Sequence, residues 1–366
     1  MAHSTKAAVF EQVGCPLTLE ELELESPRAG EVLVRLGASG VCHSDLHVID
    51  GEWEVPVPLV LGHEGAGVVE AIGEGVRDVS VGNRVVLSWF YPCRRCRYCA
   101  SGRGWACTGT RSSDCVLDDG TPPFRRASGE SVYSYLTVGS FAGLTLVPEA
   151  GAIPVADEVP YEVGALIGCG VTTGVGAVVN NAEVPAGAAT VVVGCGGVGL
   201  SVVMGAKLAG ADPIVAVDLA DEKLELAREL GATHTVRADG DWVAQARSIT
   251  GGGADFAFEA IGLVETVERL PDLLANGGTG VLVGLTATGV RASFDVLSFA
   301  ESGKRLIGSN YGGSIPSVDF PRIAQLFLAG ALPLDKLITH RIALEELEDA
   351  FAAMRRRERA RSVIVY

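Results

Sequence analysis

The stretch from residue 189 to residue 218 constrains the fold of this chain more than any other. It reads ATVVVGCGGVGLSVVMGAKLAGADPIVAVD, in which Gly194, Gly196 and Gly199 form a G-x-G-x-x-G pattern. The pattern follows one strand-like run and opens a helix-like run, and a second strand-like run then ends at Asp218. A strand before, a helix after, and an acidic residue roughly twenty positions on together predict a dinucleotide-binding βαβ unit.

The residues of this motif suit a dinucleotide chemically. Glycines let the backbone approach a pyrophosphate, and the helix N-terminus supplies partial positive charge; Gly197 and Val198 belong to the same turn. Asp218 is expected to accept hydrogen bonds from ribose hydroxyls and to repel the extra phosphate of NADP, which favours NAD. Lys223 is a candidate for the ribose, with a solvated helix lysine as the alternative. A plain tight turn is the alternative explanation of the glycines.

Residues 171–312 alternate between strand-like and helix-like runs. The strand-like runs include ATVVVG, PIVAVD, ADFAFEA and GTGVLVGL, and the helix-like runs include ADEKLELARELG and LVETVERLPDLLANG. This alternation predicts an α/β domain with a doubly wound parallel sheet covered on both faces. The uncharged run 184–206 has the length of a membrane span, but Pro185 and several glycines interrupt it, so we expect a strand, a turn and a helix there.

The flanking segments have a different texture. Residues 1–170 contain short β-like runs such as EVLVRLGASG and GNRVVLSWF, broken by glycine and proline, and predict a mostly antiparallel β domain. Residues 313–366 contain two amphipathic helical patterns, FPRIAQLFLAG and LEELEDAFAAMRRRERA, and end in the β-like RSVIVY. A last strand needs a sheet to pair with, so we expect 313–366 to rejoin residues 1–170 in one domain.

Four cysteines are crowded into PCRRCRYCASGRGWAC, where Cys93, Cys96, Cys99 and Cys107 have the spacing C-x2-C-x2-C-x7-C. The N-terminal MAHSTKAAVFEQVG lacks the apolar core of a secretory signal, which predicts a reducing, cytoplasmic location where disulfides rarely persist. We therefore predict a closed structural zinc site with four thiolates. Four arginines lie among or beside the ligands and are expected to offset the negative charge and favour thiolates: Arg94, Arg95, Arg97 and Arg103.

A second set of metal-ligand residue types is dispersed along the chain. GVCHSDLH holds Cys42, LGHEGAG holds His63, and GCGVTTG holds Cys169. Two thiolates and one imidazole can bind zinc and leave a position open for substrate. Their spacing alone does not establish a site, since a lone cysteine is more often a small buried residue. The remaining cysteines, Cys15, Cys115 and Cys195, are predicted to be packing residues. We assign no role to His3, His234 and His340.

Five segments, taken in their order along the chain, resemble the zinc-dependent alcohol dehydrogenases of the medium-chain dehydrogenase/reductase superfamily. They are PRAGEVLVRLGASGVCHSDLH, LGHEGAG, the four-cysteine segment, GCGVTTG and VVVGCGGVGL. The resemblance covers nearly the whole chain. It implies a GroES-like catalytic domain, a Rossmann NAD-binding domain, two zinc ions per chain and a homodimer joined through the nucleotide-domain sheets. The site residues that it implies are Cys42, His63 and Cys169 on the catalytic zinc, Glu64 behind the metal, Asp45 orienting His63, Thr173 and Val198 at the nicotinamide, and Arg361 at the pyrophosphate.

The same resemblance implies a proton route. Hydride transfer needs an alkoxide, which zinc stabilises; Ser44 then takes the proton and passes it through a ribose hydroxyl to His47 near the surface. His43 stands where several relatives carry arginine against the pyrophosphate, so we expect looser coenzyme binding and faster release. Trp89 stands where relatives have another aromatic residue in the substrate pocket, and Ser44 leaves slightly more room than threonine.

The expected substrate is an apolar or aromatic primary alcohol or its aldehyde, in an apolar pocket with Trp89 and Phe141. The alternative is a thiol-dependent formaldehyde dehydrogenase, which SWFYPCRRCRYC and the loop after it also resemble; Arg111, Arg125 and Arg126 would then bind the thiol's carboxylate. The stretch HVIDGEWEVPVP, shorter and differently charged than in glutathione-dependent relatives, favours the plain alcohol.

Other functional classes are disfavoured. The formal net charge of −16 repels nucleic acid and anionic membrane surfaces. A non-catalytic zinc and nucleotide binder of this fold is disfavoured as well, because all three expected zinc ligands are present.

Overall fold

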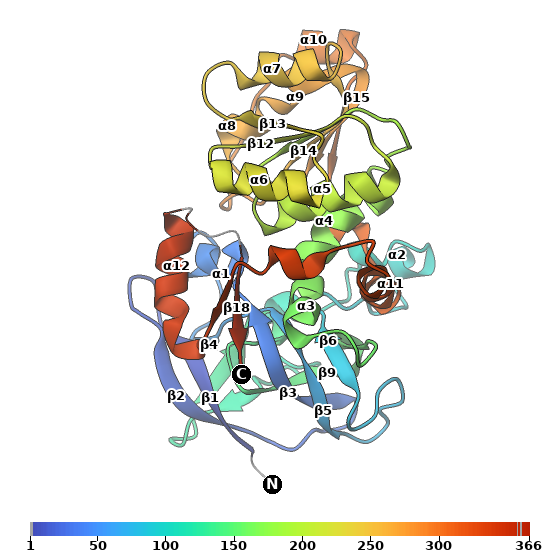
Figure 1. Cartoon of the computed structure of the whole chain (residues 1–366). Helices are drawn as coiled ribbons and strands as arrows, with labels where there is room; N and C mark the ends of the chain where they lie inside the picture. Colours follow the sequence, from blue (N-terminus) through green and yellow to red (C-terminus); the bar gives the residue numbers. More distant parts are fainter. Residues whose placement is uncertain (1–2, 357, 359–360) are drawn as a thin grey trace. The chain divides into compact units, whose positions relative to one another are not determined.

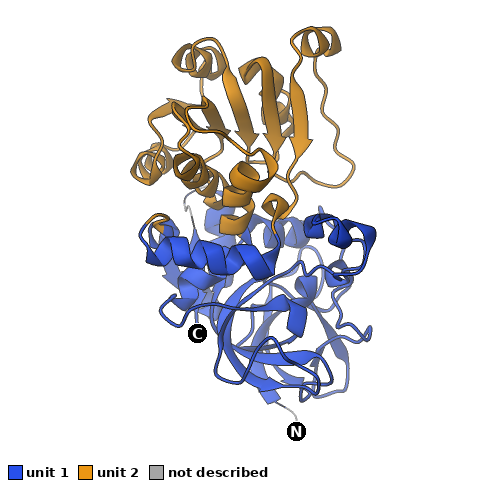
Figure 2. Cartoon of the chain, turned by 90° about the vertical axis from the view of Figure 1, so that its right-hand side faces the viewer, with its two compact units in different colours: residues 1–169, 315–330, 334–366 blue, residues 170–314, 331–333 orange. Residues whose placement is uncertain are grey.

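The computed structural model describes residues 3–356, 358 and 361–366. They form two compact units, which Figure 2 colours separately: unit 1 comprises residues 1–169, 315–330 and 334–366, and unit 2 comprises residues 170–314 and 331–333. The domain boundaries expected from the sequence differ from these by one or two residues, apart from 331–333, which cluster with unit 2.

One part of unit 1 is a small closed barrel whose strand order is β1-β2-β7-β8-β4. Neighbouring strands are antiparallel except β4 and β8. Buried apolar side chains fill it, among them Leu22, Leu24 and Phe124. The barrel strands are β1 (His3–Phe10), β2 (Thr18–Leu24), β4 (Leu59–Val60), β7 (Phe124–Arg125) and β8 (Ser131–Ser134).

The other part of unit 1 is a seven-stranded sheet of order β10-β6-β5-β3-β18-β17, with β9 also paired to β3. The last strand, β18, lies antiparallel to β3 with Val363 opposite Gly40, so the chain's end returns to the first domain as expected (Figure 1). The strands are β3 (Glu31–Gly40), β5 (Glu64–Ile72), β6 (Arg84–Leu87), β9 (Leu144–Pro148), β10 (Ala152–Pro154), β17 (His340–Ile342) and β18 (Ser362–Val365).

Short helices complete unit 1. Phe351 of α12 packs edge-to-face on Phe141, with ring centroids 6.2 Å apart, in a core shared with α1 and the barrel. The predicted tail helix over 344–360 is shorter than expected, because a 3-10 turn precedes α12 and α12 ends at Arg355; residues 357, 359 and 360 lie outside the described residues. The helices are α1 (His43–Ile49), α2 (Arg97–Ala100), α3 (Tyr161–Leu166), α11 (Pro316–Leu328) and α12 (Leu347–Arg355).

Unit 2 is a six-stranded parallel sheet of order β13-β12-β11-β14-β15-β16, which confirms the doubly wound fold. Figure 1 shows α5 and α6 on one face of this sheet and α7 and α9 on the other. The strands are β11 (Thr190–Val193), β12 (Ile214–Asp218), β13 (His234–Arg237), β14 (Ala254–Glu259), β15 (Leu274–Leu282) and β16 (Arg305–Gly308). The helices are α4 (Thr172–Gly176), α5 (Gly197–Ala209), α6 (Asp221–Leu230), α7 (Trp242–Ile249), α8 (Val264–Val267), α9 (Leu270–Leu273) and α10 (Val296–Glu301).

One predicted helix of unit 2 is wrong in its last third. The run LVETVERLPDLLANG forms α8 and α9, but the chain turns extended at Leu274, which pairs with Ala254 as the first residue of β15. Pro271 separates α8 from α9, because proline fits the first positions of a helix, as here in α9, but would interrupt a single helix running through it.

Among the described residues, one continuous helical stretch, 161–181, has the length and apolar composition of a membrane span. Within its most apolar window, 83% of the residues are buried, as in a core helix of a globular protein. The run 184–206 forms strand β11, the glycine turn and most of α5, as the sequence predicted.

Candidate active site

Four metal-ligand side chains of unit 1 converge in its interior. One ligand atom from each of Cys42, His63, Glu64 and Cys169 lies within 4.8 Å of the others, and all four residues are buried. Cys42 is the N-cap of α1, His63 directly precedes β5, Glu64 is the first residue of β5, and Cys169 lies in the helical turn after α3. An added Cβ at Gly168 would lie 2.9 Å from the Leu87 carbonyl oxygen, so the chain beside Cys169 packs closely on the end of β6.

His63 has the orientation expected of a zinc ligand. Its Nδ1 lies 3.1 Å from Asp45 Oδ1, and the same carboxylate accepts hydrogen bonds from the backbone N–H groups of Cys42 and Gly62, both at 3.1 Å. The other ring nitrogen, Nε2, is buried with no hydrogen-bond partner in the described part of the chain. An imidazole held by a carboxylate on one side and unpaired on the other, next to two thiols, fits zinc.

Glu64 is engaged by another partner. Both of its carboxylate oxygens accept hydrogen bonds from Arg361 Nη2, and Arg361 Nη1 donates to the Val41 carbonyl at 3.1 Å. Burial raises the pKa of Glu64 to about 7, and the guanidinium opposes this rise. The sequence expectation that Arg361 reaches a pyrophosphate stays a prediction; the structure gives its guanidinium a carboxylate partner instead.

The two thiols differ in acidity. A hydrogen bond from the Cys169 thiol holds the pKa of Cys42 well below its usual value, and the same bond, with burial, raises the pKa of Cys169 well above its own. Cys42 is therefore the first of the two to become a thiolate. Both become thiolates only when a cation offsets their charge, which is the effect of a bound metal ion.

Two predicted proton-route residues lie one turn apart on α1. Ser44 Oγ is 3.8 Å from Cys42 Sγ, and His47, three residues on, lies on the same side of the helix. The His47 side chain is only 15% exposed, so it is nearer the interior than the sequence suggested. Its Nδ1 contacts the Glu52 carboxylate, and its ring stacks on Trp53 with centroids 4.5 Å apart. Sequence reasoning missed both of these partners.

The second cluster consists of Cys93, Cys96, Cys99 and Cys107, whose sulfur atoms lie within 4.8 Å of one another. Cys96 Sγ is 3.5 Å from Cys99 Sγ and 3.9 Å from Cys107 Sγ. Burial, together with hydrogen bonds that the Cys99 thiol donates to Cys96 and Cys107, raises the pKa of Cys99 to about 12. Four thiolates at neutral pH thus require a cation, and a set of four sulfurs fits zinc.

Backbone groups favour these thiolates in a way that the sequence did not reveal, and the charge-offsetting role of the arginines stays a prediction. Backbone N–H groups of Cys99 and Thr108 lower the pKa of Cys96 to about 6, and the backbone N–H of Arg95 lowers that of Cys93. The arginine side chains have other partners: the guanidinium groups of Arg97 and Arg103 lie 4.6 and 5.5 Å from the Tyr98 ring centroid, and Arg94 pairs with Asp78 at 3.5 Å.

Gly109 is a residue of this cluster that the sequence did not reveal. A Cβ at this position would lie 2.9 Å from Cys93 Sγ, and the Gly109 N–H donates to Cys107 Sγ at 3.2 Å. The position of this glycine, two residues after the last cysteine of the cluster, could have indicated its place beside the sulfur atoms.

In unit 2 the predicted coenzyme residues lie at the carboxyl ends of β11 and β12. Gly194 has a φ of +95°, and a Cβ at Gly199 would lie 1.7 Å from the Gly194 carbonyl oxygen, so both glycines serve the turn itself. Gly196 differs: a Cβ there would meet no atom within 4 Å. Protein packing does not demand glycine at 196, which fits a backbone left open for a close ligand such as a pyrophosphate.

Asp218 accepts hydrogen bonds from the backbone N–H groups of Cys195, at 2.7 Å, and Ala220, at 2.9 Å. Each carboxylate oxygen keeps a second lone pair for a ribose hydroxyl. Cys195 is fully buried, and its burial raises the pKa of its thiol. Lys223 is half-buried close by, and its positive charge opposes this rise.

Four further coenzyme candidates occupy α4, α5 and α1. The residue after Thr173 packs on the start of α5, since a Cβ at Gly174 would lie 2.4 Å from the Val198 carbonyl oxygen. Thr173 and Val198 are half-buried, and Gly197 is the first residue of α5. His43, the first residue of α1 in unit 1, is exposed. These coenzyme roles stay predictions.

The two aromatic residues expected in the substrate pocket differ in their burial. Phe141 is fully buried in the core against Phe351, so the expectation that it lines a substrate pocket is wrong. Trp89 is half-buried two residues after β6 and packs edge-to-face on Phe90, with centroids 5.8 Å apart.

Of the cysteines expected to be packing residues, Cys115 is buried but Cys15 is half-exposed.

The arginines proposed as a thiol anchor have partners within unit 1. Arg111 donates to Asp114 at 3.0 Å and to the Asp118 carbonyl at 3.1 Å. Arg125 donates to the Gly129 carbonyl at 2.9 Å. Arg126 binds three carboxylates, those of Glu11, Glu20 and Glu130.

Two family models match the chain. One, described as an alcohol dehydrogenase GroES-like domain, matches residues 28–157, and the other, a zinc-binding dehydrogenase, matches residues 197–329. The alcohol dehydrogenase class-3 of Cereibacter sphaeroides is 37% identical, over 99% of this chain and 100% of its own length. The chain belongs to the zinc-dependent alcohol dehydrogenases of the medium-chain dehydrogenase/reductase superfamily. It is an enzyme that uses zinc and NAD(H).

Two other relatives mark the range of named activities. An S-(hydroxymethyl)glutathione dehydrogenase of Paracoccus denitrificans is 36% identical, over 99% of this chain and 100% of its own length. The solved structure of benzyl alcohol dehydrogenase from Acinetobacter calcoaceticus has a TM-score of 0.93 and 35% identity, over 99% of each chain. This zinc alcohol dehydrogenase is thus similar both to a thiol-adduct enzyme and to an aromatic alcohol enzyme.

Proposed function

We propose that this enzyme interconverts apolar or aromatic primary alcohols and their aldehydes with NAD, needs no thiol, and holds two zinc ions per chain. The observation that carries the proposal is the buried set of Cys42, His63 and Cys169, with His63 Nε2 unpaired. Three ligands leave a fourth tetrahedral position, and because Glu64 is bound to Arg361, that position is left for a substrate oxygen.

The residues around the cluster have separate roles. When bound, zinc lowers the pKa of a substrate hydroxyl, and NAD⁺ takes up the hydride. Asp45 keeps His63 in the tautomer that presents Nε2. Ser44, beside Cys42, is the proposed first acceptor of the hydroxyl proton, and His47, one turn on and in contact with Glu52, holds that proton afterwards. The four-cysteine cluster is the proposed structural zinc site.

The arginine partners favour a plain alcohol over a thiol adduct. A glutathione or mycothiol adduct brings a carboxylate that needs a cationic anchor, whereas Arg111 and Arg126 already bind acidic or carbonyl groups of this chain. The half-buried indole of Trp89, near the strand end that packs on Gly168, supplies an apolar surface suited to an aromatic substrate. The benzyl alcohol dehydrogenase relative agrees with this proposal.

A thiol-dependent formaldehyde dehydrogenase is the second candidate. Two observations favour it: the relatives named class-3 alcohol dehydrogenase and S-(hydroxymethyl)glutathione dehydrogenase, and the exposed position of Arg111, whose partner Asp114 is also half exposed. An exposed pair of this kind contributes little stability and exchanges partners readily.

The test is NADH formation from benzyl alcohol, ethanol and formaldehyde, each with and without glutathione or mycothiol. We expect benzyl alcohol to give the highest kcat/KM without thiol, because burying apolar substrate surface stabilises its complex by about 25 cal/mol per Å². Formaldehyde oxidation that strictly requires a thiol, and that falls in Arg111→Ala, would instead establish the second candidate.

We also propose that the enzyme is a cytoplasmic homodimer. Both thiol clusters need reduced cysteines, which persist in a reducing compartment. Strand β16 ends the sheet of unit 2, and in the described residues its outer edge pairs with no strand. Exposed apolar side chains gather just before it, at Val290, Phe294, Val296 and Leu297. An open edge beside such side chains suits pairing with a second copy.

A further inference from the structure

Glu259 is a buried carboxylate outside the clusters described above. It ends β14 and is fully buried. Its Oε1 accepts hydrogen bonds from the N–H groups of Ile261, at 3.0 Å, and Gly262, at 2.9 Å, and from the Thr266 hydroxyl at 2.8 Å. The side chain therefore folds back on its own chain and holds the turn 260–263, which leads into α8.

The same residue ties this turn to the loop that follows β15. Its carbonyl oxygen accepts hydrogen bonds from the N–H groups of Val283, at 2.9 Å, and Gly284, at 2.8 Å. A Cβ at Gly284 would lie 2.7 Å from Glu259 Oε2 and 2.3 Å from the Gly262 nitrogen. The turn and the loop approach so closely that only glycine fits at 284, and Glu259 lies at their junction.

This junction borders the coenzyme glycines. Strand β14 pairs with β11 so that Glu259 is opposite Val193, and the Ala260 N–H donates to the Val193 carbonyl at 2.9 Å. A Cβ at Gly194 would lie 2.4 Å from Ile261 Cγ1, so the turn packs against the first glycine of the motif. The chain builds the sheet outward from β11 to β13 and then restarts at β14, which makes the β11–β14 boundary the switch point where such sheets bind ligands.

We propose that Glu259 is a positioning residue for the coenzyme, because its carboxylate fixes the turn 260–263 and the loop after β15 against the Gly194 side of the crevice. The proposal rests on the proposed coenzyme site. Burial raises the pKa of the Glu259 carboxyl, while hydrogen bonds from Thr266 and Gly262 oppose the rise and favour the ionised form. Ile261 and Leu285, which lie at this junction, are 40% and 55% exposed.

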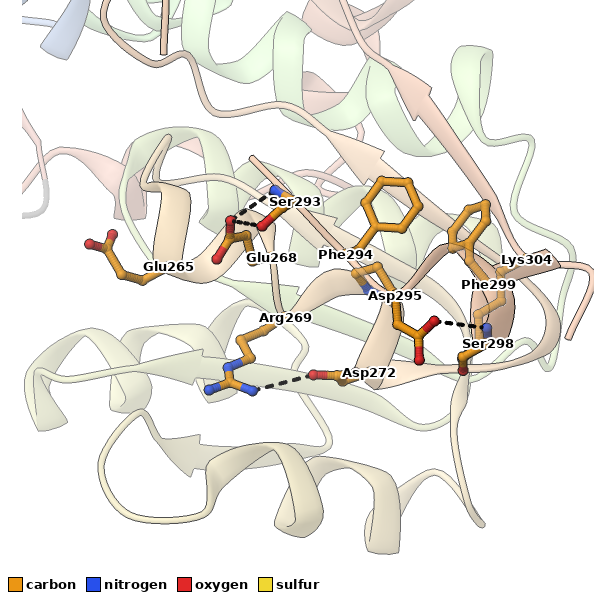
Figure 3. A pocket seen from close by; sticks show the side chains of 11 residues that line it. Glu265, Glu268, Arg269, Asp272, Ser293, Phe294, Asp295, Ser298, Phe299 and Lys304 are labelled. Atoms are coloured by element: carbon orange, nitrogen blue, oxygen red, sulfur yellow. Dashed lines mark hydrogen bonds and ion pairs between the residues drawn. The ribbon is translucent and has the colours of Figure 1, made fainter. Parts of the chain in front are cut away.

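The test compares Glu259→Gln with Glu268→Gln. Glu268 is a matched control, because it also accepts a backbone N–H and a hydroxyl, both from Ser293, at 2.8 and 2.9 Å. It does so in an open pocket lined by residues of α8, α9, α10 and the adjoining loops, none of which belongs to the glycine motif (Figure 3). In Glu259→Gln an amide N–H₂ replaces one acceptor and faces backbone donors, so the turn loses its anchor.

We expect Glu259→Gln to raise two constants about tenfold: the Kd for NADH, measured by fluorescence titration, and the KM for NAD⁺. A tenfold change corresponds to the loss of one hydrogen bond to a charged group. The kcat at saturating NAD⁺ and KM for the alcohol should change by less than about twofold. Glu268→Gln should leave both coenzyme constants unchanged. Thr266→Val, which removes one donor to Oε1, should weaken coenzyme binding in the same direction and gives the answer if Glu259→Gln does not fold.

Unchanged NADH binding in folded Glu259→Gln, or equal weakening in Glu268→Gln, would overturn this inference and leave the proposed coenzyme site intact. Failure of the unaltered enzyme to bind NADH would instead refute the proposed coenzyme site itself.

Discussion

At the scale of single residues, two carboxylates set the geometry of the candidate sites: the buried Asp45 and the half-buried Asp218. Asp45 joins the start of α1 to the start of β5 by accepting from Cys42, Gly62 and His63. Asp218 likewise joins the end of β12 to the glycine turn. Burying a carboxylate is costly unless charged or N–H partners meet it, so each of these acids fixes several backbone groups at once.

Replacing Cys169 by alanine tests the catalytic zinc site. We expect turnover to be lost and bound zinc to fall from two ions per chain to one, while NADH binding is retained, because the remaining thiol and imidazole no longer hold a metal firmly. Metal analysis of enzyme purified without chelators, with NADH titration, measures both. Cys115→Ala, at a buried cysteine outside both clusters, is the control and should keep two zinc ions. One zinc or none in the unaltered enzyme would contradict the two-site proposal.

Replacing Asp218 by alanine tests coenzyme choice. The carboxylate offers acceptors to ribose hydroxyls and repels a phosphate, so its loss should weaken NAD⁺ binding about tenfold and narrow the gap to NADP⁺. The ratio of kcat/KM for the two coenzymes is the measurement, and Asp221→Ala, on the exposed first turn of α6, serves as control. Better use of NADP⁺ than NAD⁺ by the unaltered enzyme would refute the role given to Asp218.

At the scale of elements, the sequence predicted most of what local pattern determines. The apolar runs of β11, β12 and β14 are strongly patterned and were found. Strands β13 and β16 were missed because HTVR and RLIG are four-residue edge strands in which at most one residue is buried, so neither has a clear apolar pattern. The candidate zinc ligands could be named, but not the partnership of Arg126 with Glu11 and Glu20, because contacts between distant segments leave no local pattern.

Arg126 illustrates such a contact, since it binds Glu11, Glu20 and Glu130 and so ties β1, β2 and the β7–β8 turn of the barrel together. Hydrogen bonding to Arg126 lowers the pKa of Glu20 below its ordinary 4.5. A depressed carboxyl pKa contributes stability above 4.5 and loses it as the pH falls through the folded-state value. Arg126→Met should therefore lower the free energy of unfolding by about 1 to 2 kcal/mol at pH 7 and by clearly less near pH 3.5.

Urea unfolding of both proteins at the two pH values measures that difference. Arg125→Met is the matched control, because its guanidinium donates to the Gly129 carbonyl and not to a carboxylate. An Arg126→Met penalty that is equal at both pH values would mean that packing of the arginine stem, not its charge, stabilises the barrel.

At the scale of the whole molecule, the proposed catalytic site and the proposed glycine-motif coenzyme site lie in separate units. It leaves unit 1 after Cys169, builds the nucleotide sheet, and returns at residue 315 to supply α11, α12 and β18. The catalytic unit is therefore complete only once the last strand pairs with β3, which also brings Arg361 to Glu64. A truncation that removes β18 would thus alter the zinc site from the far end of the sequence.

The open edge of β16 leads to the last prediction, which concerns assembly. In the described residues the sheet of unit 2 ends at β16, and Val296 and Leu297 of nearby α10 are 71% and 68% exposed. Pairing two such edges would continue the sheet and cover these side chains, whereas a charge there would have to be buried unpaired, which is costly. Leu297→Asp should therefore convert a dimer to a monomer in light scattering behind size exclusion. Val81→Asp, at an exposed valine of unit 1, should leave the dimer intact. If the unaltered enzyme already has the mass of a single chain, or if both variants remain dimers, then β16 and α10 do not form the interface.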